Sequence, residues 1–139
     1  MQALTVFLSQ HLTLAYLFLG LMVALILVEF IRLRRLNYAI TAKEAVHLMN
    51  REHATVVDLR DKAAFTEGHI IDAVHADTTD VKALAKKLDK QRTKPVILIC
   101  QTGVSAQKIA VQLSHEGFHV HAVTGGIAAW KQADLPLVK

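Results

Sequence analysis

The fold is decided by the stretch VILICQTGVSA, residues 96–106. Its first four residues are all apolar, which is typical of a central strand that is buried on both faces of a sheet. A short loop containing Gln101, Thr102 and Gly103 follows, and a helical pattern begins at Val104. A buried strand that leads through a loop into a helix is the repeating unit of α/β proteins with a parallel sheet.

The same alternation extends outward from this stretch in both directions. Thr41 and Glu44 form a capping box, which marks the start of a helix that we expect to reach about Asn50. Short β-branched or alternating runs predict strands at residues 55–58, 73–75 and 119–123. Further helices are predicted after Asp61, after Thr79 or Asp80, at 104–114 and at 127–132. The predicted fold class is therefore α/β, with a central parallel sheet and helices on both faces.

The N-terminal part has a different composition. Residues 12–31 form an apolar run that only Thr13, Gly20 and Glu29 interrupt. A helix of this length is about 30 Å long and matches the hydrocarbon core of a bilayer. A signal peptide would show a basic segment before the run and a small-residue cleavage site, and a buried core helix would be shorter. We therefore predict one transmembrane helix.

The arginines predict the orientation of this helix. No Lys or Arg precedes the run, whereas Arg32, Arg34 and Arg35 follow it at once. The positive-inside rule then places the C-terminal part in the cytoplasm, and in a bacterium the membrane would be the inner or plasma membrane. The expected organisation is a short extracytoplasmic N-terminus (1–11), a transmembrane helix (12–31), a basic juxtamembrane linker (32–39) and a folded domain (40–139).

The positive net charge of the chain comes largely from this arginine cluster and does not indicate a nucleic-acid partner. The formal net charge is +4, yet from residue 36 onward there are 13 basic and 11 acidic residues. The lysines at 82, 86, 87 and 90 lie opposite an apolar stripe, as on the solvated face of an amphipathic helix. The expected partner is instead the lipid bilayer. A homodimer or a membrane-protein partner is left open, and the small residues Gly20 and Ala24 have a spacing that permits helix pairing.

The single cysteine, Cys100, is the candidate nucleophile. It excludes an internal disulfide framework and a zinc site built from cysteines. Cys100 ends the central strand, at the sheet edge where α/β proteins bind ligands. The loop after it leads into a helix N-terminus, whose free amides favour an anion such as a thiolate, and Gly103 permits a left-handed backbone there. The alternative is a buried cysteine that acts only as a small hydrophobe.

Four blocks of the sequence resemble a single-domain rhodanese. Val56 to Arg60 followed by Phe65, and Gly68 to Ile70 followed by Ala73, are similar to the first signature of that family. The loop from Cys100 to Ser105 resembles its active-site loop, and Gly125 to Trp130 followed by Pro136 resembles its closing motif. The resemblance covers about residues 39–139 and implies the rhodanese fold and sulfurtransferase activity.

This resemblance also implies roles for particular residues. Cys100 would carry sulfane sulfur as a persulfide. The cradle for that sulfur would be formed by the amides of Gln101, Thr102, Gly103, Val104 and Ser105, with the Ser105 hydroxyl as an added donor. The partners would be a sulfur donor and a thiophilic acceptor, each a small molecule or a protein, and no cofactor is implied. Asp58, Arg60 and His69 are interpreted as scaffolding, with Arg60 paired to a nearby carboxylate and His69 bonded to backbone.

Departures from the family pattern leave alternatives open. Asp72 stands where the family usually has glycine, which predicts an altered turn. Gln101 and Thr102 are neutral where thiosulfate-using relatives often carry basic residues, so a persulfide on a protein or on a small thiol is equally open as the donor. A membrane-tethered binding module with little or no catalysis remains an alternative, as does a redox-sensing thiol that forms only intermolecular disulfides.

Two further chemistries are disfavoured by the residues present. A cysteine phosphatase of the same loop type needs Arg six positions after the cysteine, where this chain has Ala106. His119 and His121 share one face of a predicted strand, but no Cys or carboxylate at suitable spacing completes a metal site. We therefore predict no metal.

Overall fold

The structure is a computed structural model that describes residues 2–36, 38–76 and 80–139. It divides into two units, Met1–Leu36 and Asn37–Lys139. The first unit contains helices α1 (Gln2–Gln10) and α2 (Leu12–Leu36). Within Leu12–Leu33, an 18-residue stretch has a mean hydropathy of 2.6 and is 0% buried, so by length and composition α2 is apolar enough to cross a membrane.

The end of α2 differs from the predicted boundaries. The helix continues past Ile31 to Leu36, so the first five residues of the predicted linker 32–39 are helical. Glu29 pairs with Arg32 one turn later, with 3.8 Å between the carboxylate and guanidinium atoms. This ion pair neutralises the one acidic side chain of α2, which lies where the apolar part of the helix gives way to its arginines.

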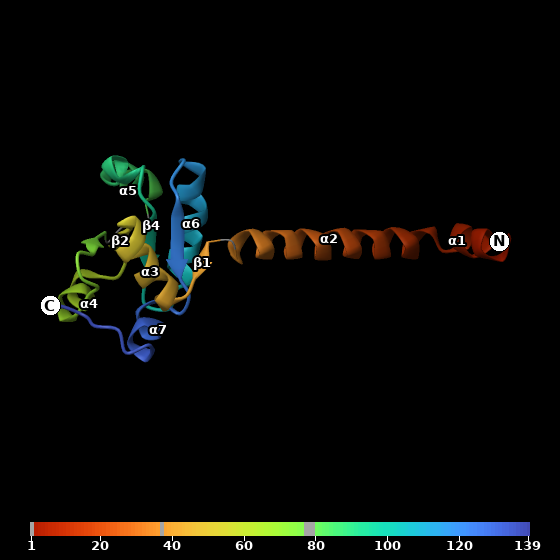
Figure 1. The fold of residues 1–139 in the computed structure, drawn as a ribbon. Helices are drawn as coiled ribbons and strands as arrows, with labels where there is room; N and C mark the ends of the chain where they lie inside the picture. The colour runs from red at the N-terminus through yellow and green to blue at the C-terminus, as the bar shows by residue number, and fades with distance from the viewer. Residues whose placement is uncertain (1, 37, 77–79) are drawn as a thin grey trace. The chain divides into compact units, whose positions relative to one another are not determined.

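The second unit is a five-stranded sheet with the strand order β1-β5-β4-β2-β3 (Figure 1). Every strand pair in it is parallel. The strands are β1 (Ala39–Ile40), β2 (Thr55–Asp58), β3 (Val74–His75), β4 (Val96–Ile99) and β5 (Val120–Val123). The helices are α3 (Ala42–Glu52), α4 (Lys62–Glu67), α5 (Val81–Lys87), α6 (Val104–His115) and α7 (Gly126–Gln132), with a 3-10 turn η1 (Asp89–Gln91). The α/β prediction is confirmed.

The central strand β4 explains why helices cover both faces of the sheet. Its side chains alternate between two buried clusters because successive residues of a strand point to opposite faces. Val96 and Leu98 belong to the cluster that contains the apolar sides of α5 and α6. Ile97 and Ile99 belong to the other cluster, together with residues of α3 and α7. All four side chains are fully buried.

The predicted helix starts are confirmed by their caps. At α3 the Thr41 hydroxyl accepts the Glu44 N–H at 3.2 Å, and the Glu44 carboxylate accepts the Thr41 N–H at 2.7 Å. Asp61 accepts the Ala64 N–H at 2.7 Å and so caps α4. Asp80 caps α5, whereas Thr79 lies outside the described residues.

Two local features differ from expectation. The edge strand β1 was not predicted, because it has only two residues and falls at the predicted linker boundary. Asp72 adopts φ +58°, the left-handed conformation that glycine usually provides. Directly after this turn, Val57 of β2 pairs with Val74 of β3.

Candidate active site

Cys100 lies directly after β4, at the carboxyl ends of the parallel strands. The residue is 6% exposed. Its Sγ accepts a hydrogen bond of 3.0 Å from the N–H of Gly103. A backbone donor aimed at the sulfur stabilises negative charge on it. The structure thus gives the candidate nucleophile an N–H partner within its own loop.

The other residues of the predicted cradle lie on either side of Gly103 in the sequence. Gln101, Thr102 and Ser105 are exposed, and Val104 is 58% exposed. Val104 and Ser105 begin α6, so their amides lack partners within the helix. Within the described parts of the chain, no acceptor is found for the amides of Gln101, Thr102, Val104 and Ser105. The loop therefore contains four unused donors close in sequence to the sulfur.

Gly103 takes the left-handed conformation that the sequence indicated, with φ +87°. A side chain here would also collide with the turn after β5, because a Cβ would lie 2.8 Å from the amide nitrogen of Gly125 and 2.8 Å from the carbonyl oxygen of Val123. Both backbone angle and space thus require glycine at this position.

Gly125 and Gly126 lie against the Cys100 loop, although the sequence had not indicated a role for them in the site. A Cβ on Gly126 would overlap the carbonyl oxygen of Cys100 and lie 2.8 Å from the carbonyl carbon of Gln101. The next residue, Ile127, donates its N–H to that Cys100 oxygen at 2.9 Å. The start of α7 therefore fixes the backbone of Cys100. The available signal in the sequence was a pair of adjacent glycines after a strand.

A buried ion pair supports the neighbouring loop. The Arg60 Nε lies 3.0 and 3.1 Å from the two carboxylate oxygens of Asp58, and Nη2 lies 2.8 Å from one of them. Nη2 also donates to the carbonyl oxygen of Gly68 at 2.7 Å. The Asp58 side chain is 0% exposed and that of Arg60 is 6% exposed. This confirms the predicted pairing of Arg60 with a nearby carboxylate.

His69 also has the predicted scaffolding contact. Its Nδ1 lies 2.9 Å from the carbonyl oxygen of Phe65, and the two rings stack with centroids 3.9 Å apart. His75, at the end of β3, places Nε2 at 2.8 Å from the carbonyl oxygen of Arg60. The loop between β2 and β3 is therefore held by side chains that bond to backbone.

Two histidines, His121 in β5 and His119 just before it, were considered as metal ligands. His121 is partly buried, and its Nδ1 has no hydrogen-bond partner among the described residues. Burial lowers the pKa of His121, and His119 acts in the same direction, whereas Glu52 and Glu44 oppose the shift. In the described parts of the chain, no group of three His, Cys, Asp or Glu side chains is arranged to hold a metal ion.

Comparisons with known proteins bear on the family and the fold of the chain. The family model described as the rhodanese-like domain matches residues 41–133. The uncharacterized protein YibN of Escherichia coli K12 is 35% identical over 141 residues, which cover 100% of this chain and 99% of YibN. The thiosulfate sulfurtransferase GlpE of Pseudomonas putida is 37% identical over 93 residues, 66% of this chain and 83% of GlpE. A crystal structure of a rhodanese-related protein from Thermoplasma volcanium superposes with a TM-score of 0.61 at 25% identity, over 72% of this chain and 96% of that one.

Proposed function

The chain belongs to the rhodanese-like domain family, and on that premise we propose that it is a membrane-anchored sulfurtransferase that carries sulfane sulfur on Cys100. The observation that carries the proposal is the hydrogen bond from the Gly103 amide to the Cys100 sulfur, in a loop with further unused amides. The similarity to thiosulfate sulfurtransferases supports the reaction class. The apolar helix α2 supports the anchor.

In the first half-reaction, the Cys100 thiolate attacks the outer sulfur of a donor. A new S–S bond forms on Cys100 and the bond between that sulfur and the rest of the donor breaks, with its electron pair leaving on the donor. With thiosulfate the leaving group is sulfite. The product is a Cys100 persulfide anion, and the total charge is unchanged.

In the second half-reaction, a thiophilic acceptor attacks the terminal sulfur of the persulfide. Its bond to Cys100 breaks, and the electron pair returns to the Cys100 thiolate. With cyanide the product is thiocyanate. Because the enzyme alternates between thiolate and persulfide, ping-pong kinetics are expected. Free amides of the loop would hold the terminal sulfur anion between the two steps.

The lack of charged side chains in the Cys100 loop affects which sulfur donor is expected. Gln101 and Thr102 are exposed and carry no charge, so they provide no cation for the dianion thiosulfate. A persulfide donor of lower charge is therefore expected to load Cys100 faster than thiosulfate does.

Mass spectrometry of the full chain tests the proposal. The purified chain in a mild detergent is incubated with thiosulfate, polysulfide or a low-molecular-weight persulfide and weighed intact. A gain of one sulfur atom that cyanide removes is the expected result. Since Cys100 is the only cysteine, Cys100→Ser is the matched control and should gain none. Failure with every donor, or equal loading of Cys100→Ser, would refute the assignment.

The proposed topology places the rhodanese-like domain in the cytoplasm and the N-terminus outside, with the arginines after the apolar run as its basis. Protease digestion of sealed membrane vesicles of both orientations tests it. The domain should be cleaved only in inside-out vesicles. Cleavage in right-side-out vesicles would reverse the orientation, and release from the membrane without detergent would exclude the anchor.

A second candidate function is a tethered binding module that uses the loop as a docking surface. It is favoured by Val104, an apolar side chain of the loop itself that is 58% exposed. Co-purification with the intact anchor distinguishes the two functions. Equal partner recovery with wild type and Cys100→Ser, together with no persulfide, would favour the binding module.

A further inference from the structure

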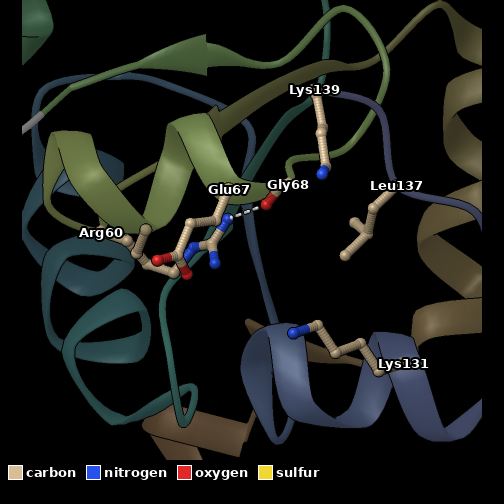
Figure 2. A pocket seen from close by; sticks show the side chains of 7 residues that line it. Arg60, Glu67, Gly68, Lys131, Leu137 and Lys139 are labelled. Carbon is tan, nitrogen blue, oxygen red and sulfur yellow. Dashed lines mark hydrogen bonds between the residues drawn. The ribbon is translucent and has the colours of Figure 1, made fainter.

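A pocket that is separate from the Cys100 loop lies between α4, α7 and the segment that follows α7 (Figure 2). Its volume is about 380 Å³. Its lining consists of Arg60, Ala64, Glu67, Gly68, Lys131, Leu137 and Lys139. No residue of the loop 100–105 contributes to it, so the pocket is not part of the candidate nucleophile site.

Positive charge is concentrated at this pocket. Figure 2 shows the amino groups of Lys131 and Lys139 directed into the space from opposite sides, and the Arg60 guanidinium at a third position on its wall. Glu67 is the acidic side chain among the lining residues. The charge of Arg60 is neutralised by its buried ion pair with Asp58. The two lysines and Glu67 together still give the pocket lining a net positive charge.

Arg60 also presents an unused donor group. Its Nε and Nη2 are bonded to Asp58 and Gly68. For Nη1, no acceptor is found in the described parts of the chain, and Nη1 is not among the buried polar atoms that lack a partner, so it is accessible at the pocket wall. This donor is therefore available to water or to a ligand in the pocket. Arg60 and both lysines line the same pocket.

We propose that this pocket binds an oxyanion, the carboxylate or phosphate group of a small ligand. The oxyanion accepts a hydrogen bond from Arg60 Nη1 and is paired with the amino groups of Lys131 and Lys139. Guanidinium and ammonium groups together are a common donor set for such groups. Ala64 and Leu137 provide apolar contacts for the carbon atoms of an organic ligand.

The pocket lies at the same sheet edge as Cys100. Asp58 pairs with Ile99 in the sheet, and the Leu59 N–H donates to the Ile99 carbonyl oxygen at 2.8 Å. Arg60 and Cys100 therefore follow adjacent strands. Oxyanion binding itself requires no sulfur transfer, so this proposal stands independently of the proposed function.

Calorimetric titration of the full chain in an uncharged maltoside detergent tests the proposal. Inorganic phosphate and succinate are titrated separately at constant ionic strength. The pocket variant is Lys131→Gln combined with Lys139→Gln. The control variant is Lys86→Gln combined with Lys108→Gln, which removes the same charge from exposed positions on α5 and α6. Fluorescence of Trp130, the single tryptophan, verifies that each variant is folded.

Saturable binding of at least one anion is expected for wild type, weakened about tenfold in the pocket variant and less than about twofold in the control. Binding of phosphate alone or of succinate alone would support the proposal and identify the class of oxyanion. No saturable binding of either anion would overturn it. Equal weakening in both double variants would overturn it too, because only net charge would then matter. Unchanged binding in the pocket variant would assign the anion to another site.

Discussion

Gly126→Ala is expected to disrupt the backbone that holds Cys100. The added Cβ would overlap the carbonyl oxygen of Cys100 and approach Gln101. Gly126 has φ +59°, which alanine adopts only with strain. The hydrogen bond from the Ile127 N–H to the Cys100 oxygen cannot keep its 2.9 Å length if the two segments separate. The substitution therefore acts on the loop without changing any of its residues.

The magnitude follows from three contributions. The left-handed backbone costs alanine about 1 kcal/mol. Relief of the steric overlap by backbone shifts costs about 1–3 kcal/mol. The lost or lengthened hydrogen bond to Cys100 costs about 1 kcal/mol. We expect the free energy of unfolding to fall by about 3–5 kcal/mol, a large part of the stability of a small domain.

Gly117→Ala is the matched control. Gly117 has φ +86°, yet a Cβ there would have only the Arg92 guanidinium within 4 Å, at 3.6 Å. Backbone strain is thus similar and the overlap is absent, so a loss of about 1 kcal/mol is expected. Urea unfolding followed by Trp130 fluorescence measures both variants, because this side chain lies on α7 and is 3% exposed.

The comparison also includes sulfur loading of Cys100. At a urea concentration where Gly126→Ala remains folded, its persulfide formation should be slower than that of Gly117→Ala, because the Cys100 backbone has moved. The reasoning would be refuted if the two variants lost the same stability. It would equally be refuted if Gly126→Ala were as active as wild type.

Three further substitutions, one of them with a matched control, test the remaining scaffold by urea unfolding. Asp58→Asn leaves the buried Arg60 without its countercharge and should lower the free energy of unfolding by about 3–5 kcal/mol. Its control, Asp89→Asn, breaks an exposed ion pair and should lower it by about 1 kcal/mol or less. Equal losses of stability in the two variants would contradict this prediction. His121→Phe should reduce the pH dependence of stability. Burial lowers the pKa of His121 below its ordinary value of 6.5 in the folded protein, so the unfolded chain binds the proton more readily. The wild-type protein therefore loses stability as the pH falls through about 6.5. An unchanged slope between about pH 7 and 5 would exclude that cause. Asp72→Gly should raise the free energy of unfolding by about 0.5 kcal/mol by removing left-handed strain, and a loss of stability would show that the Asp72 side chain is needed.

Local sequence signals predicted most of the fold. The all-apolar strand β4, the Thr41 capping box and the Asp61 cap each depend on residues within a few positions of one another. Strand β1 could not be predicted in this way. Its two residues, Ala39 and Ile40, become a strand only because they pair with β5.

The same distinction applies to the candidate site. Cys100 and its loop were found because the strand and the helix N-terminus adjoin them in sequence. Arg60 lies two residues from its partner Asp58, so their pairing was also a local prediction. The contact of Gly126 with Cys100, and the convergence of Lys131 with Arg60, join segments that are distant in sequence. Only the tertiary structure shows them.

The pairing of β1 with β5 has a consequence for synthesis of the chain. Ala39 pairs with Ala122, which is made about 80 residues later. The strand that follows α2 therefore remains without its sheet partner until β5 has left the ribosome. Because pairing between residues so distant in sequence raises the contact order, we expect closure of the sheet at this edge to be a late step. The N-terminal helix is available to a membrane well before the domain behind it can finish folding.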